Sequence, residues 1–345
     1  MKGRSGAMGR AAASMIVVLA MLASTGLASA QTADRFKGKI FEVVVGYDTG
    51  GGYDIYARAL ARHIGKHLPG NPTVVVKNMP GAQTRTAANY LYNIAPKDGT
   101  VIGTIARGLP TEELLGSGGI RFESAKFNWI GSMNNEVSVG VAWHTSPIKT
   151  LDDTKQREMV VGGIADSVLF AQVMNAILGT RFKTITGYKS GGEIGLAMER
   201  GEVEGRMGWS WSSVVSMNPE WIREGKIRNL VQFSTSKHAD LPNVPLVTEL
   251  AGSDADRALL ELVFSRQVIG RPFIAPPGLD AETLQILRKA FDDTMRDPAF
   301  LAEMQKANLE VNPIPGAEVQ KLIERLFKTP PAVLERAKTI IPVEK

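Results

Sequence analysis

A cluster of glycines follows an apolar run and directly precedes a predicted helix. Residues 43–45 are all valine, residues 50–52 are all glycine, and a helical segment begins at Ile55. Backbone N–H groups at such a helix N-terminus can hold an anion, because the helix dipole favours negative charge there. A tight turn that needs positive φ is the alternative interpretation. The stretch lacks the motifs of dinucleotide-binding and nucleotide phosphate-binding loops.

Two basic residues could bind a carboxylate. Arg107 follows a predicted strand at 100–105, and Lys189 lies in a predicted loop at 187–192. An arginine can hold a carboxylate with two parallel hydrogen bonds, and a hydrogen bond to a charged group contributes about 1.5–3 kcal/mol. A surface salt bridge is the alternative role of each residue.

Tryptophans and asparagines are further candidates for ligand contact. Trp209 and Trp211 follow a short predicted strand and could form an apolar wall or belong to the core. Asn134 and Asn135 lie near a predicted passage between domains and could donate amide hydrogens to a ligand.

Metal and catalytic motifs are incomplete. His63 and His67 share a helix face at zinc-binding spacing, but no glutamate follows His63, so a solvated face is favoured. Residues 208–212 resemble a nucleophile elbow around Ser210 but lack its final glycine. We expect no enzyme activity, no metal and no cofactor.

The amino terminus has the features of a secretory signal peptide. Three basic residues precede an apolar run at 11–23, and Ala28-Ser29-Ala30 matches a cleavage site before Gln31. The run is shorter than the roughly 20 residues of a membrane span, although an uncleaved anchor is the alternative. We expect export to the periplasm.

Composition excludes several classes of protein. Removal of residues 1–30 takes away three basic residues and no acidic ones, so the formal charge falls from +5 to +2. No basic stripe with interleaved aromatics suggests a nucleic-acid partner. The absence of cysteine excludes disulfides and thiol chemistry. A length of 345 residues allows about two domains.

Strands and helices alternate through most of the chain. Continuously apolar, β-branched strands are typical of a parallel sheet that is covered on both faces. The first part has predicted strands at 40–45, 73–77 and 100–105, a helix at 54–68, and a helix that runs to residue 94 and is capped by Thr84 or Thr86. The second has strands at 159–164, 182–186, 203–208 and 227–233, with a helix capped by Asp166 or Ser167. Asp280 and Asp297 are predicted to begin helices in a helical third part, where a further helix begins at Gly316.

Strand-like segments connect these parts. Residues 127–130 and 137–143 link the first part to the second, and residues 260–269 link the second to the helical tail. Two such connections suggest that the chain passes twice between two domains with a cleft between them.

Short motifs in a fixed order resemble the Bug family, the extracytoplasmic solute receptors of tripartite tricarboxylate transporters. The resemblance covers about residues 40–327. The motifs are GGGYD at 50–54, VVVKNMPGA at 74–82, APKDGT at 95–100, YKSGG at 188–192, GEVE at 201–204, LPNVP at 241–245 and APPG at 275–278.

The resemblance implies an α/β protein with the two-lobed fold of periplasmic binding proteins, similar to their type II. Each lobe is then a mostly parallel sheet flanked by helices, with a hinge of two crossing strands. We expect a cleaved signal peptide at 1–30, one lobe from 31–135 and 270–345, and a second lobe from 136–269.

The resemblance also implies a cleft that binds a small carboxylate through helix N-termini, as ligands of open α/β sheets lie at the carboxyl ends of the strands. The expected ligand-binding residues, with Arg107 from the preceding argument, are Tyr47, Asp48, Thr49, Gly50, Gly51, Gly52, Gly81, Ala82, Gln83, Thr84, Arg107, Ala165, Asp166, Ser167, Tyr188, Lys189, Ser190 and Gly191.

Two departures from the family pattern concern the ligand. Many relatives have prolines where this chain has Tyr47, Asp48 and Thr49, and glycines where it has Gln83 and Thr84. Asp48 is unfavourable beside an anion, so it turns away, bonds within its loop, or faces an amine or hydroxyl. Asp54 is expected to cap the helix rather than contact ligand.

A periplasmic receptor that delivers its ligand to membrane permease subunits is therefore the expected function. We expect a monomer. A ligand-binding input protein for a sensor and a secreted hydrolase on the same scaffold are the alternatives.

Overall fold

The computed structural model describes residues 34–164, 166–188 and 190–341. The predicted signal peptide and the predicted site residues Ala165 and Lys189 lie outside them, as does the side chain of Asp166. Within the described ranges, no helix is both long and apolar enough to span a membrane.

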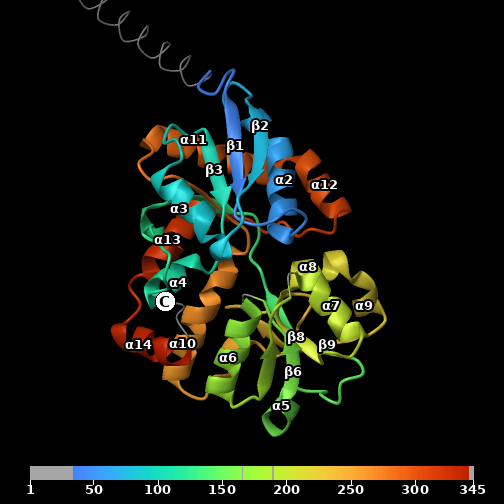
Figure 1. The fold of residues 1–345 in the computed structure, drawn as a ribbon. Helices are drawn as coiled ribbons and strands as arrows, with labels where there is room; N and C mark the ends of the chain where they lie inside the picture. The colour runs from blue at the N-terminus through green and yellow to red at the C-terminus, as the bar shows by residue number, and fades with distance from the viewer. Residues whose placement is uncertain (1–33, 165, 189, 342–345) are drawn as a thin grey trace, which may run out of the picture.

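Two β-sheets organise the chain (Figure 1). The first has the order β11-β4-β10-β3-β1-β2, with β1 (Ile40–Val45), β2 (Thr73–Asn78), β3 (Val101–Thr104), β4 (Asn128–Ser132), β10 (Pro272–Ala275) and β11 (Ile314–Pro315). The second has the order β7-β6-β8-β5-β9, with β5 (Ser138–Trp143), β6 (Met159–Gly162), β7 (Phe182–Ile185), β8 (Gly205–Ser210) and β9 (Ile227–Phe233).

Most strands of each sheet run in one direction. In the first sheet, β1 pairs in parallel with β2 and β3, whereas β10 and β11 are antiparallel to their neighbours. In the second, β6 pairs in parallel with β7 and β8, and β5 is antiparallel to β8 and β9. The expected α/β class with two mostly parallel sheets is confirmed.

Helices cover both faces of the first sheet (Figure 1). Tyr56, Leu60 and Phe291 pack on one face, and Leu91 and Val319 pack on the other. These helices are α2 (Gly52–Ile64), α3 (Arg85–Asn93), α11 (Ala281–Arg296), α12 (Pro298–Lys306) and α13 (Gly316–Leu326). The shorter α4 (Leu109–Leu115) follows β3, and single 3₁₀ turns lie at Gly65–His67, Ala82–Thr84 and Ser124–Lys126.

The second sheet is also buried between helices. Phe170 and Phe264 belong to the core on one face, and Ile194 and Trp221 to the core on the other. The helices of this part are α5 (Asp153–Gln156), α6 (Asp166–Leu178), α7 (Gly191–Glu199), α8 (Trp211–Met217), α9 (Pro219–Arg223), α10 (Asp254–Phe264) and α14 (Pro331–Ile340). A 3₁₀ turn at Val247–Leu250 precedes α10.

The expectation that both passages between the sheets are strands is wrong for the second passage. The chain first passes from β4 to β5, as expected. The predicted strand at 260–269 is instead the end of α10 followed by a 3₁₀ turn at Ser265–Ile269. Leu259, Leu260, Val263 and Phe264 are buried at i, i+1, i+4 and i+5, which is the period of a helix face rather than of a strand.

The carboxyl-terminal helix returns to the second sheet. Ala337 of α14 and Ile341 beyond it are buried in the core that also contains Phe170 and Phe264. The exact lobe boundaries stay a prediction. Helix α14, which belongs to the predicted first lobe, packs beside α10 in the core of the second sheet.

Two of the predicted helix starts are confirmed by capping. The side chain of Asp280 accepts a hydrogen bond from the Thr283 N–H at 2.8 Å, and Asp297 accepts one from the Ala299 N–H at 2.9 Å. These caps satisfy N–H groups that have no partner within α11 and α12.

Candidate ligand-binding site

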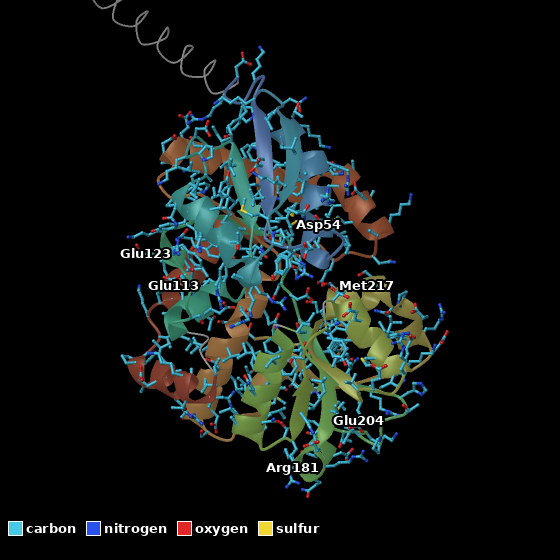
Figure 2. All side chains as sticks on the ribbon, viewed as in Figure 1. Asp54, Glu113, Glu123, Arg181, Glu204 and Met217 are labelled. Atoms are coloured by element: carbon cyan, nitrogen blue, oxygen red, sulfur yellow. The ribbon has the colours of Figure 1, made fainter. Side chains whose placement is uncertain are left out.

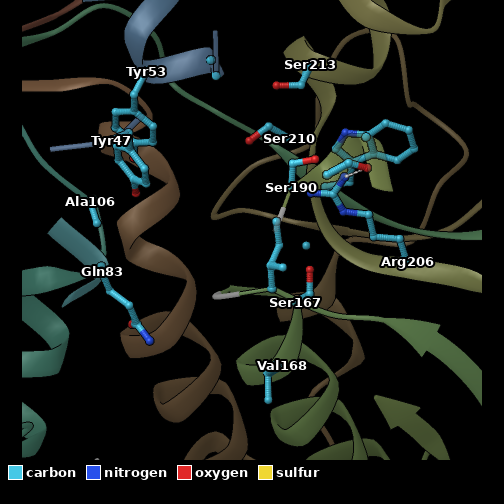
Figure 3. Close-up of a pocket in the computed structure, with 18 of the residues that line it drawn as sticks. Tyr47, Tyr53, Gln83, Ala106, Ser167, Val168, Ser190, Arg206, Ser210 and Ser213 are labelled. Carbon is cyan, nitrogen blue, oxygen red and sulfur yellow. Dashed lines mark hydrogen bonds between the residues drawn. The ribbon is translucent and has the colours of Figure 1, made fainter. Parts of the chain in front are cut away.

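A pocket of about 1150 Å³ lies between the two sheets. It is lined by the segment from β1 into α2, the residues after β3, the start of α7 and the end of β8. In Figure 3, Tyr47, Tyr53 and Gln83 face Ser190, Arg206 and the serines of the other wall across it.

The glycine-rich segment forms the first wall. Residues 47–53 all line the pocket, and α2 begins at Gly52. Gly50 has φ of 84°, a conformation that favours glycine. The segment is therefore a tight turn and also lines the pocket. The N–H groups of the first turn of α2 lie at this wall.

Asp54 closes the glycine turn from inside the helix. Its carboxylate accepts hydrogen bonds from the Gly50 N–H and Arg58 Nε, both at 2.9 Å, and from Asn78 Nδ2 at 2.8 Å. Burial by itself would raise the pKa of Asp54, but these hydrogen bonds outweigh it and the pKa lies below its usual value. Asp54 is 2% exposed and is not among the lining residues, so its side chain supports the loop. The expectation that Asp54 caps the helix is wrong, because α2 begins before it and Gly51 occupies the N-cap position.

Asp48 lies exposed at the pocket wall. It has no hydrogen-bond or ion-pair partner within the described ranges, which argues against a bond inside its own loop. Its position leaves the carboxylate available to a ligand or to water.

Aromatic rings support the same wall. The rings of Tyr47 and Tyr53 are stacked with centroids 4.4 Å apart, and the guanidinium of Arg271 lies 4.8 Å from the Tyr53 centroid. The stack presents flat apolar surface to the pocket, next to a cation.

The turn from Gly81 to Thr84 is left-handed throughout. Ala82, Gln83 and Thr84 have φ of 44°, 52° and 73°, although none is glycine. Of the four, Gln83 lines the pocket. Thr84 is 1% exposed, and its hydroxyl accepts a hydrogen bond from the Ala106 N–H at 2.9 Å, so it holds the loop after β3 instead of capping α3.

Arg107 lies in the pocket wall and is 6% exposed. Its Nη2 donates to the Ser138 hydroxyl at 3.3 Å, and its backbone N–H donates to the Tyr53 hydroxyl at 3.3 Å. The side chain of Arg107 is therefore buried in the wall rather than exposed at the protein surface. Arg85 also lines the pocket and pairs with Glu112 at 3.0 Å.

The start of α7 forms the opposite wall. Ser190 caps this helix, because its hydroxyl accepts a hydrogen bond from the Glu193 N–H at 3.3 Å. Gly191 and Gly192 begin the helix, and Ser167 from α6 lies nearby in the same wall (Figure 3). Tyr188 is not a lining residue; it packs partly buried against the core of the second sheet.

Arg206 is a wall residue that no motif of the sequence predicts. It lies on β8 beside the start of α7, and its Nη1 donates to the Gly191 carbonyl at 3.3 Å. A single arginine in a short strand carries no motif, and only the folded sheet brings it to α7. The sequence signal that points to Arg206 is a basic residue within a short strand whose end reaches the pocket.

The two tryptophans have different roles. Trp209 lines the pocket and is 5% exposed, with its ring 5.9 Å from that of Trp221. Trp211 is not a lining residue, and its indole donates to Asp240 at 3.2 Å. The wall interpretation therefore suits Trp209, and the core interpretation suits Trp211.

Other predicted contacts lie away from the pocket. Asn134 is fully buried and donates to Glu136 at 3.2 Å, and neither it nor Asn135 lines the pocket. His63 and His67 do not form a solvated face, because they contact Glu303 and Asp297 at 2.9 and 2.8 Å. Within the described ranges, no cluster of three or more potential metal ligands occurs.

A family model decides the relationship of this chain to known proteins. The model described as tripartite tricarboxylate transporter family receptor, TctC, matches residues 56–338. The chain belongs to this family. The match confirms the resemblance to the Bug receptors.

One related sequence and two solved structures are similar to this chain over most of its length. A Cupriavidus necator protein, described as UPF0065 protein in gbd 5'region, is 27% identical over 92% of this chain and 94% of its own. The solved structure of the periplasmic binding protein BugD is 22% identical, with a TM-score of 0.64 over 90% of this chain and 100% of its own. The structure of R. palustris Rpa4515 with adipate is 17% identical, with a TM-score of 0.64 over 86% and 96%. At these identities, the two structures show the shared two-lobed fold.

Proposed function

We propose that this TctC-family receptor captures a small organic carboxylate in the pocket between its two sheets. The observation that carries the proposal is the convergence of two helix N-termini, those of α2 and α7, on one pocket from different sheets. Each begins with glycines, so backbone N–H groups can approach an anion without interference from side chains.

The charge of the wall supports an anionic ligand. Among the described residues, five arginines line the pocket: Arg85, Arg107, Arg206, Arg266 and Arg271. Four acidic residues of the described ranges line it as well, and Glu112 among them is paired with Arg85. The adipate in the R. palustris structure is a linear dicarboxylate, which is the ligand class we propose here.

The predicted contacts fall into two groups under this proposal. Backbone N–H groups of Gly51, Gly52, Gly191 and Gly192 receive the carboxylate oxygens. Side chains of Tyr47, Gln83, Arg107, Ser167 and Ser190 line the remaining surface.

Ligand binding would work through lobe closure without a chemical reaction. A ligand that contacts both walls binds the closed arrangement better and shifts the population toward it. The closed receptor, exported to the periplasm, then delivers its ligand to membrane permease subunits. A sensor protein in place of the permease is the alternative partner.

The test begins with the ligand that the protein carries. Mass spectrometry of small molecules released from the purified protein identifies it, and calorimetry measures affinity for succinate, adipate and citrate. The matched controls are the neutral amides of the same acids. Carboxylate binding with compaction in small-angle scattering is expected. Binding of cations or neutral amides alone would refute the proposal, and turnover of any bound compound would show an enzyme.

A further inference from the structure

The strongest unassigned feature of the pocket is the buried cation Arg206. This residue is 9% exposed and forms no ion pair with any acidic side chain in the described part of the chain. Nη1 donates to the Gly191 carbonyl, whereas Nε is buried without a hydrogen-bond acceptor among the described residues. Glu199 and Glu220 also line the pocket, but neither pairs with it.

Burial of a charge without a counter-ion is costly for a protein. Desolvation of this guanidinium lowers the pKa of Arg206 to about 10. Another buried arginine of the wall, Arg271, has the buried carboxylate of Glu136 at 3.4 Å. Arg206 therefore has a cost that a bound anion would offset.

Hydrogen-bond donors dominate the surroundings of Arg206. The N–H groups of Gly191 and Gly192 belong to the first turn of α7, where no intrahelical acceptor exists. The Ser190 oxygen already accepts from the Glu193 N–H, so its hydroxyl hydrogen is available to a ligand. The part of the pocket beside Arg206 therefore presents hydrogen-bond donors. It suits a ligand group that only accepts hydrogen bonds.

Trp209 fixes the orientation of the guanidinium. The carbon at its centre lies 4.9 Å from the centroid of the indole ring, so the cation rests against an aromatic face. In Figure 3 Arg206 and Ser190 lie together on the wall opposite Tyr47 and Tyr53. A planar carboxylate can then meet the planar fork of the arginine.

We infer that Arg206 is the direct counter-ion of a ligand carboxylate and selects ionised carboxylates over carboxamides at the start of α7. The inference rests on the proposed function and deepens it. A carboxamide would turn its NH₂ donors toward the donors of Arg206, Gly191 and Gly192, whereas a carboxylate accepts from all of them.

The test compares Arg206→Met with Arg181→Met. Both remove one positive charge, and Arg181 lies at the far end of the second sheet from the pocket (Figure 2). Calorimetry uses succinate, adipate, citrate and benzoate with their matched amides. Arg206→Met should weaken carboxylate binding about 10- to 150-fold, while Arg181→Met leaves it unchanged. Arg206→Lys should keep only part of the wild-type affinity for carboxylates, since lysine has the charge but lacks the planar fork.

Melting of the empty protein separates a binding role from a structural one. If Arg206 serves the ligand, its replacement by methionine removes an uncompensated buried charge, and the empty variant melts at or above the wild-type temperature. Melting more than about 4 °C below wild type would mark a structural cation and overturn the inference.

The remaining outcomes separate the two proposals. Carboxylate binding by Arg206→Met within threefold of wild type would overturn the role of Arg206 and leave the proposed function intact. A wild-type protein that binds none of the carboxylates, or binds the amides equally well, would overturn both.

Discussion

His238 and Glu310 meet across the junction of the two sheets, with Nε2 of the imidazole 3.6 Å from Oε2 of the carboxylate. His238 follows β9 of the second sheet, and Glu310 lies between α12 and β11 of the first. Asp240 also approaches the imidazole, at 3.7 Å. The Glu310 carboxylate raises the pKa of His238 above its usual value, although burial acts in the opposite direction.

We predict that this contact makes the stability of the protein fall as pH rises. A raised pKa in the folded state contributes stability that is fully present below the unfolded pKa of about 6.5 and is lost as pH rises through the folded pKa. His238→Gln should remove about 1 kcal/mol or less at pH 5.5 and almost nothing at pH 8.5. Denaturant unfolding at both pH values measures this difference. The control is His144→Gln, whose histidine is exposed, and an equal loss at both pH values would contradict the ion-pair explanation.

Glu136 and Arg271 form a buried pair beside the pocket. Glu136 is fully buried, Arg271 is 4% exposed, and Glu136 Oε2 also accepts from the Ser212 hydroxyl at 2.6 Å. Glu136→Leu leaves Arg271 without its counter-ion and should destabilise the protein by about 3–5 kcal/mol. Adding Arg271→Met should recover most of the loss in chemical denaturation. Additive losses in the double variant would show that the pair is not coupled.

Asp48 is predicted to determine which second functional group of the ligand the pocket prefers, at the end away from Arg206. An exposed carboxylate in the wall repels a second carboxylate and attracts an amine or hydroxyl. Asp48→Asn should improve binding of a dicarboxylate by about 1 kcal/mol, or roughly fivefold, and weaken binding of an amino or hydroxy acid. Calorimetry with succinate and aspartate on both proteins measures the change. Equal shifts for the two ligands would show that Asp48 does not face them.

Local signals explain which elements could be predicted from the sequence. The apolar strand β1 and the periodic helix α2 are both found where the sequence predicts them. Each has a strong hydrophobic pattern, and a glycine turn separates them. The strand predicted at 260–269 is wrong because a fully buried helix end and a buried strand have the same apolar composition. The helix period extends back to Leu259, which precedes this segment.

The site was harder to predict than the fold. Residues of the α2 loop and Ser190 have local motifs, so their place in the pocket wall could be anticipated. Arg206 has no such motif, and its significance depends on the lack of an ion-pair partner among the described residues, which only the tertiary structure reveals. Thr84 was predicted as a ligand contact, yet its hydroxyl is used by the Ala106 N–H, a bond between segments 22 positions apart.

Gly191 is predicted to be required for the position of Arg206. A methyl group added there would lie 2.5 Å from Arg206 Nη1, too close for any real contact, so Gly191→Ala must displace the guanidinium. The backbone of the first residue of α7 accepts alanine as well as glycine, so the variant should still fold. Its affinity for carboxylates should fall about tenfold in calorimetry, as one charged hydrogen bond is lost.

Gly252→Ala is the control for this substitution, because its added carbon would lie 3.7 Å from the nearest atom, Asp256 Oδ2, away from the pocket. It should leave affinity unchanged. Wild-type affinity in Gly191→Ala would mean that the guanidinium can move without loss, and that the backbone N–H groups of α7 hold the carboxylate alone. A loss of affinity at unchanged stability would instead show that the fold keeps glycine at this position so that a buried cation can lie against the helix start.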